Sequence, residues 1–211
     1  STRAQRGIIS AVYTWVGDMI VEPTLILSAW MPGSGKTTLA RMAARALRLP
    51  VFSKDRVQRV LRDHHLAAEN TGDGYYIILD MADEQLGLGV SAILDATFPL
   101  DHFRVVASEI AARHSARFCA IYCYCSDDTV WRRRMEQRVQ YVPGWRPVGW
   151  DDVLRMRAYY QPWGGNALPI DSLRPPEENV DAVLAQIASA THYRYVAYQP
   201  RDRRDAPPQQ L

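Results

Sequence analysis

Residues 24–47, TLILSAWMPGSGKTTLARMAARAL, decide the fold class. An apolar strand pattern over Thr24–Ala29 leads into a glycine-bearing turn, and a helix with one apolar face follows. The turn ends in Gly35, Lys36 and Thr37, which complete the last part of G-x-x-x-x-G-K-[ST] between a strand and a helix. Successive backbone N–H groups in such a turn bind anions, and the helix N-terminus adds partial positive charge. The stretch therefore predicts a phosphate-binding loop in an α/β domain.

The polar residues of this loop have distinct expected tasks. Lys36 can reach the β- and γ-phosphates of a nucleotide, and the Thr37 hydroxyl can be a ligand of Mg²⁺. Gly33 and Gly35 allow a backbone conformation and a close approach that a side chain would obstruct. The residues predicted to bind the nucleotide are Pro32, Gly33, Ser34, Gly35, Lys36, Thr37 and Thr38.

Trp30 stands where this pattern usually opens with glycine. One interpretation is that Trp30 only ends the strand, where a bulky side chain is tolerated; the other is that the loop is defective. The later positions of the pattern are intact, which favours the first interpretation.

Length and composition fit one globular domain. The 211 residues suffice for one sizeable core, and 25 Lys and Arg against 23 Asp and Glu leave a net charge of +2. This balance neither requires nor excludes a nucleic-acid partner. The apolar runs are far shorter than the ~20 residues needed to cross a bilayer, and residues 1–20 lack a signal-peptide cleavage pattern. We expect a cytoplasmic protein without a membrane partner.

Strand and helix patterns alternate beyond the loop. This order predicts a P-loop NTPase fold of the α/β class, with a mainly parallel five-stranded sheet flanked by helices. The candidate strands are Thr24–Ala29, Val51–Ser53, Ser91–Asp95, Phe118–Cys125 and Leu168–Asp171.

Candidate acceptor-side residues follow the second and third of these strands. Residues beyond the carboxyl ends of parallel strands line the ligand crevice, so Asp55 is placed to accept the proton of an attacking hydroxyl. A helix N-cap is an equally favoured interpretation of Asp55. Asp95 ends a buried strand, where a carboxylate is costly unless it is paired or binds metal, so it is predicted to help hold Mg²⁺ or a water molecule beside Thr37. Structural capping by Asp95 or Thr97 is the alternative. Thr97, Arg104 and Arg59 are predicted to contact the acceptor.

An arginine-rich helix is predicted within SDDTVWRRRMEQRV, residues 126–139. Arg134 and Arg138 are four residues apart and share a face. Two like charges side by side are unfavourable unless an anion lies against them, and a triphosphate would serve. The alternative is a solvated face without a ligand.

Five segments together resemble the small P-loop kinases with AAA-type ATP-binding domains that are grouped with zeta toxins and polynucleotide 5′-kinases. The resemblance covers roughly Thr24 to Ala188, and the segments stand in the family's order: MPGSGKTTLA, FSKDRV, LDATF, CSDDTVWRRRMEQR and IDSLRPPEENVDAVLAQI.

The resemblance implies a nucleoside triphosphate (ATP or GTP) with Mg²⁺ as donor and a hydroxyl as acceptor. It also implies that Lys36 and Thr37 bind phosphate and Mg²⁺, that Asp55 is the base, and that Arg134 and Arg138 are a lid pair. Trp30 departs from the family pattern, and so does Gln58, which stands where an arginine often follows the base.

The sequence thus predicts a kinase that transfers the γ-phosphate of ATP to a hydroxyl of a small molecule, a nucleoside or a polynucleotide end. The alternative is an ATP-binding regulatory or assembly module with little turnover. We expect an N-terminal extension over residues 1–23, a kinase domain over 24–190 with a lid near 126–150, and a flexible tail over 191–211. Neither the acceptor nor the oligomeric state follows from the sequence.

Overall fold

The computed structural model describes residues 22–66, 72–137, 148–164, 167–189 and Tyr195. Three of the five predicted strands have the predicted bounds. The third strand, Ala92–Asp95, begins one residue later than predicted, and the fourth, Arg117–Tyr124, begins and ends one residue earlier. The elements in chain order are β1 (Thr24–Ala29), α2 (Lys36–Leu47), β2 (Val51–Ser53), α3 (Lys54–Asp63), α4 (Asp73–Gly87), β3 (Ala92–Asp95), α5 (Asp101–Arg113), β4 (Arg117–Tyr124), α6 (Asp128–Gln137), α7 (Trp150–Tyr159), β5 (Leu168–Asp171) and α8 (Pro176–Ser189).

The strands form one five-stranded parallel sheet in the order β2-β3-β1-β4-β5, which confirms the predicted fold class. Asp95, the last residue of β3, lies opposite Ser28 of β1 and Ser53 of β2. Because all the strands run the same way, their carboxyl ends meet at one edge of the sheet. The residues that follow β1, β2 and β3 are therefore brought together there.

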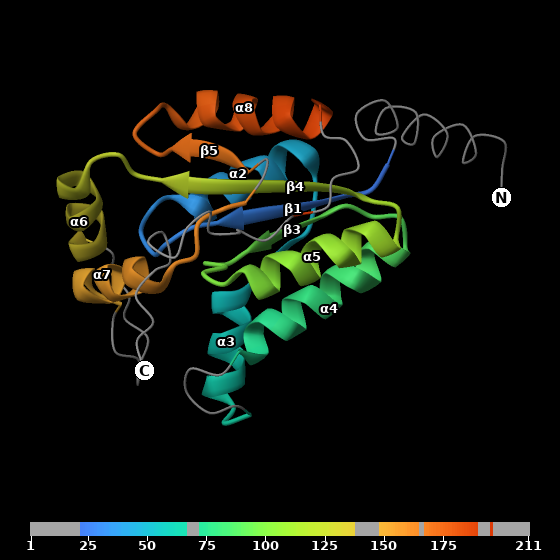
Figure 1. Ribbon diagram of the computed structural model, residues 1–211, viewed down its shortest axis with the longest axis horizontal. Coiled ribbons are helices and arrows are strands. Elements are labelled where there is room, and N and C mark those ends of the chain that lie inside the picture. Colours follow the sequence, from blue (N-terminus) through green and yellow to red (C-terminus); the bar gives the residue numbers. More distant parts are fainter. Residues whose placement is uncertain (1–21, 67–71, 138–147, 165–166, 190–194, 196–211) are drawn as a thin grey trace, which may run out of the picture.

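Helices cover both faces of the sheet, as parallel strands require. Helices α2 and α8 lie on one face, and α4 and α5 lie on the other, while α6 and α7 lie beyond the carboxyl ends of the strands (Figure 1). Alternation along β1 explains the two cores, since Ile26 packs among residues of α2 and α8 whereas Leu25 and Leu27 pack among residues of α4 and α5.

A third apolar cluster joins the arginine-rich helix to the phosphate loop. It contains Met31 of the loop, Trp131 and Met135 of α6, and Val153 of α7. The indole Nε1 of Trp131 donates a hydrogen bond to the Pro32 carbonyl at 2.9 Å. Helix α6 is therefore fixed against the loop that opens α2.

Several predicted features lie outside the described residues. They are residues 1–21 of the N-terminal extension, residues 138–147 of the lid with Arg138, and all of the tail except Tyr195. Among the helices that the structure does describe, none is long and apolar enough to cross a membrane.

Candidate active site

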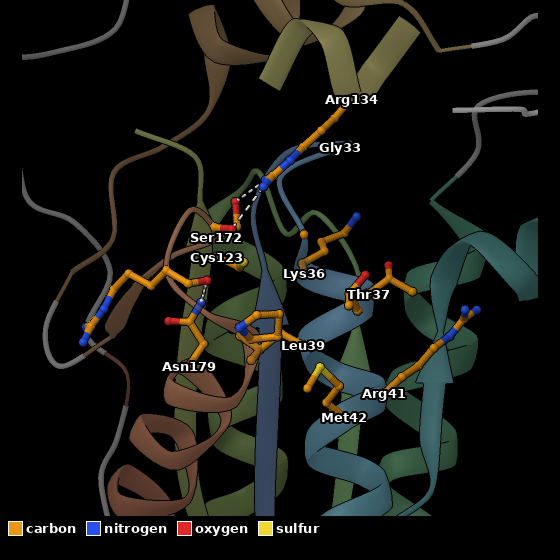
Figure 2. Close-up of a pocket in the computed structure, with 14 residues that line it drawn as sticks. Gly33, Lys36, Thr37, Leu39, Arg41, Met42, Cys123, Arg134, Ser172 and Asn179 are labelled. Atoms are coloured by element: carbon orange, nitrogen blue, oxygen red, sulfur yellow. Dashed lines mark hydrogen bonds between the residues drawn. The ribbon is translucent and has the colours of Figure 1, made fainter. Parts of the chain in front are cut away.

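A cavity of about 480 Å³ opens beside the phosphate loop at the carboxyl ends of the strands (Figure 2). It is bounded by the loop, helix α2, the end of β4, helix α6 and the segment that joins β5 to α8. We call it the donor cavity. Its lining residues are Gly33, Gly35, Lys36, Thr37, Thr38, Leu39, Arg41, Met42, Cys123, Arg134, Ser172, Arg174, Pro176 and Asn179.

Two loop glycines are required by both conformation and space. Gly33 and Gly35 have φ values of 74° and 105°, in the region that L side chains rarely adopt. A Cβ on Gly33 would lie 2.2 Å from Sδ of Met135, and one on Gly35 would lie 3.0 Å from Cβ of Ser172. The close contacts of the loop with α6 and with the segment after β5 thus depend on bare glycine backbone.

Lys36, Thr37 and Asp95 form the polar floor of the site. Lys36 begins α2, and its carbonyl accepts a hydrogen bond from the Ser28 hydroxyl at 3.1 Å. The Thr37 hydroxyl donates to Oδ1 of Asp95 at 3.2 Å. Asp95 is only 3% exposed, and burial raises its pKa while Lys36 and Thr37 oppose that rise. A buried carboxylate beside a hydroxyl is the oxygen donor set that suits Mg²⁺.

Arg134 reaches from α6 across the donor cavity (Figure 2). Its guanidinium donates to the hydroxyl of Ser172 at 2.7 Å and to the Ser172 carbonyl at 3.1 Å. Of the predicted arginine pair, Arg134 therefore lines the cavity as a preorganised cation. Arg138 belongs to the segment that the structure does not describe.

Asp55 lies in the first turn of α3, directly after β2. Strand β3, which ends in Asp95, lies between β2 and β1, the strand that precedes the phosphate loop. Ser53 occupies the N-cap position, so the interpretation of Asp55 as the N-cap is wrong. The Asp55 side chain is 55% exposed, and its Oδ1 lies 3.8 Å from Nζ of Lys54. The same Nζ lies 5.5 Å from the ring centroid of Tyr75, and Ser53, two residues before Asp55, pairs with Asp95, so these groups lie at one edge of the sheet.

The other acceptor-side residues differ in placement. Thr97, half-buried, follows β3 and shares a hydrogen bond with the phenol of Tyr75. Arg59, on α3, is solvent-exposed, and its Nε lies 3.9 Å from Oδ2 of Asp63.

Arg104 requires a correction. Its side chain is fully buried in the core and donates to the carbonyls of Phe98 at 2.9 Å and Gln161 at 2.8 Å. It also pairs with Asp101 and lies 4.1 Å from the ring centroid of Trp163. Its donors are used inside the protein, so the structure contradicts the predicted contact with an acceptor. Arg104 instead ties the loop after β3 to the segment before β5.

Trp30 has a backbone conformation that glycine adopts more readily than other residues. Its φ is 113°, and its N–H donates to the Thr97 carbonyl at 3.4 Å. The indole lies away from the residues that line the donor cavity, with ring centroids 4.5 Å from Tyr160 and 5.4 Å from Tyr122. The ring therefore does not obstruct the donor cavity.

Sequence reasoning missed the residues after β5 that close the cavity. Ser172 contacts Arg134, and Asn179 donates to the carbonyls of Asp171 and Arg174 at 2.9 Å and 3.4 Å. One signal was available, because these residues follow the carboxyl end of a predicted parallel strand. No such signal marked Arg41 and Met42, because they lie within α2 and fit the pattern of an ordinary amphipathic helix.

Comparison with known proteins agrees with this architecture. The chain is 24% identical to a kinase-like protein from Chloroflexus aurantiacus, with a TM-score of 0.61, covering 78% of this chain and 93% of that one. It is 17% identical to the Mycobacterium tuberculosis APS kinase CysC, solved with AMPPNP and APS (TM-score 0.57; 80% and 98% covered). It is also 17% identical to Chaetomium thermophilum Kti12, solved with ADP-AlF3 (TM-score 0.61; 78% and 99% covered).

No curated protein matches the chain significantly in sequence. The narrower resemblance to zeta toxins and polynucleotide 5′-kinases stays a prediction. A family model described as AAA domain (AAA_33) matches residues 25–162, which is more than half of the chain. The chain therefore belongs to this AAA domain family and has the α/β fold of the P-loop kinases.

Proposed function

We propose that this protein is an ATP-dependent phosphotransferase that moves the γ-phosphate to a hydroxyl group. One observation carries the proposal: a phosphate loop with Lys36 and an exposed carboxylate, Asp55, meet at the same edge of the sheet, on either side of Asp95. Binding of a nucleotide needs the loop alone, whereas transfer to a hydroxyl also needs a group that takes the hydroxyl proton.

The donor half accounts for the triphosphate. A cavity of about 480 Å³ lies within the size range of small-molecule sites. The loop amides and Lys36 would bind phosphate oxygens, and Arg134 adds a second cation across the cavity. Thr37 and Asp95 would hold Mg²⁺, which neutralises charge on the phosphate oxygens when bound.

The acceptor half accounts for transfer. A hydroxyl that attacks phosphorus in line must be oriented and must lose its proton, and a carboxylate does both. Asp55 is open to solvent, so an incoming hydroxyl can reach it. The acceptor class stays broad: a small molecule, a nucleoside or a nucleic-acid end.

A labelled-phosphate screen tests the proposal. The full chain, Mg²⁺ and γ-labelled ATP or GTP are incubated with a 5′-hydroxyl oligonucleotide, adenosine, glucosamine or cell extract, with Lys36→Ala as the control. We expect label in an organic product with the wild-type protein only. Wild-type protein that binds Mg²⁺-ATP yet labels nothing, extract included, would instead support the regulatory module.

A further inference from the structure

The acceptor side contains a hydrogen-bonded pair of hydroxyl groups that the proposed chemistry has not used. The phenol oxygen of Tyr75, on α4, lies 2.5 Å from Oγ1 of Thr97, in the loop after β3. The two residues are 22 positions apart in the chain. Packing, and not local sequence, therefore brings them together.

A third group contacts the Tyr75 oxygen. The backbone N–H of Phe98 can only donate, and it donates to the Tyr75 oxygen at 3.3 Å. The phenol proton can point at Thr97, and the second lone pair of the phenol oxygen could equally accept the Thr97 proton. Burial raises the pKa of Tyr75 to about 12, so the phenol keeps its own proton at neutral pH. When Thr97 accepts the phenol proton, the threonine's own proton must point elsewhere.

The surroundings hold both partners in place. The Tyr75 ring stacks on Phe103, with centroids 4.3 Å apart. Helix α4 approaches α3 closely at Gly74, where a Cβ would lie 3.0 Å from Oε1 of Gln58. The Thr97 carbonyl accepts a separate hydrogen bond from the phenol of Tyr160 at 2.8 Å. Two tyrosines thus hold the same residue, one through its hydroxyl and one through its carbonyl.

We propose that Tyr75 donates its phenol proton to Thr97 and is thereby a positioning residue, because the Thr97 hydroxyl is then left as a directed hydrogen-bond donor for an oxygen atom of the acceptor. This inference rests on the proposed function. Asp55 lies on the same side, since Nζ of Lys54 is 3.8 Å from its Oδ1 and 5.5 Å from the ring centroid of Tyr75. The carboxylate would accept the proton of the acceptor hydroxyl, and Thr97 would donate to an acceptor oxygen. An acceptor without such an oxygen would leave a buried hydrogen bond unmade.

Kinetics of matched variants test the inference, with whichever screened compound accepts the label: the oligonucleotide, adenosine or glucosamine. Tyr75→Phe should raise the acceptor KM roughly five- to tenfold, the effect of losing about one hydrogen bond, while Mg²⁺-ATP affinity stays the same. Thr97→Val should do the same, and Thr97→Ser should restore much of that loss. Tyr160→Phe is the control, because it frees the Thr97 carbonyl but leaves the hydroxyl pair intact.

A double variant completes the test. If Tyr75 acts through Thr97, Tyr75→Phe combined with Thr97→Val should raise the acceptor KM no more than Thr97→Val alone. Additive losses would overturn the inference, and so would a Tyr75→Phe effect no larger than that of Tyr160→Phe. Melting temperatures of all variants separate loss of fold from loss of positioning. Failure of the wild-type protein to transfer phosphate would overturn the proposed function and this inference with it.

Discussion

The donor side and the acceptor side of this site are built in different ways. The phosphate loop with Lys36 and Thr37 comes from one continuous stretch, and backbone geometry at Gly33 and Gly35 shapes it. The acceptor side is assembled from the first turns of α3 and α4 and from the loop after β3. A local motif can be recognised in a sequence, whereas an assembly depends on how distant elements pack.

Packing of the acceptor side depends on one buried cation. Arg104 joins the loop after β3 to the segment before β5 through several backbone carbonyls, and Tyr195 donates to its partner Asp101 at 2.5 Å. The phosphate loop also meets distant residues, since Gly33 lies against Met135 and Gly35 against Ser172, but its shape comes from its own backbone. The two sides should therefore respond differently to substitution.

The largest expected effect is on stability. Arg104→Met should lower the free energy of unfolding by roughly 3–5 kcal/mol, since it leaves a buried carboxylate and several carbonyls without their partner. Arg113→Ala is the matched control on the same helix, because its exposed pair with Asp83 should contribute less than ~1 kcal/mol. Chemical denaturation measures both. Equal losses in the two variants would contradict the structural role of Arg104.

The next effect concerns the donor side. Lys36→Ala should weaken Mg²⁺-ATP binding and slow transfer by a factor of ~10² or more, because a main charge partner of the phosphates is lost. Titration calorimetry and the labelled-phosphate assay report the two quantities. Unchanged turnover would contradict the assignment of the donor site.

A smaller effect concerns pH. Burial raises the pKa of Asp95, and only the carboxylate can be a metal ligand, so Mg²⁺-nucleotide affinity should fall as the pH is lowered towards the usual carboxyl range near ~4. The Asp95→Asn variant should bind the Mg²⁺-nucleotide more weakly than the wild-type protein at neutral pH. The affinity advantage of the wild-type protein should shrink roughly tenfold for each pH unit below the pKa of Asp95. Titration of the nucleotide itself is common to both proteins. A ratio of wild-type to Asp95→Asn affinity that stays constant with pH would argue against Asp95 as a metal ligand.

The smallest effect is expected at Trp30. Trp30→Gly should leave nucleotide affinity within a few-fold, because the loop amides follow this residue and its indole lies outside the donor cavity. Gly33→Ala offers the contrast, since its Cβ would overlap Sδ of Met135. A large gain in affinity for Trp30→Gly would show that the natural loop is defective.

Much of this architecture could be predicted from local signals. The alternation of strand and helix patterns, together with the phosphate-loop spacing, predicted the five parallel strands. Three strands have the predicted bounds, and the bounds of the other two differ by one residue. Short continuous apolar runs carry this information because a strand such as β1, with helices on both faces of the sheet, buries all of its side chains. The position of Lys36 and Thr37 at the start of α2 follows directly from the motif.

The acceptor side shows what a single sequence hides. Arg104 seemed a candidate only because it is charged and follows Thr97, yet it shares a helical face with Ala107 and Ala111, which are both buried. That spacing was the available sign of a core position. Tyr75 gave no sign at all, because its partner Thr97 is brought near only by the packing of α4. The left-handed backbone at Trp30 was equally hidden.

The central claim is that the chain transfers phosphate and does not merely bind a nucleotide, and Asp55→Asn tests it most directly. Asparagine keeps the size of the side chain but cannot take a proton. Melting temperature, Mg²⁺-ATP affinity and transfer rate are measured on the same preparations of wild-type and variant protein. We predict unchanged folding and affinity, with transfer slowed by roughly 10² to 10⁴. Near-normal transfer by the variant would contradict the role of Asp55 as the base and leave the acceptor site unassigned.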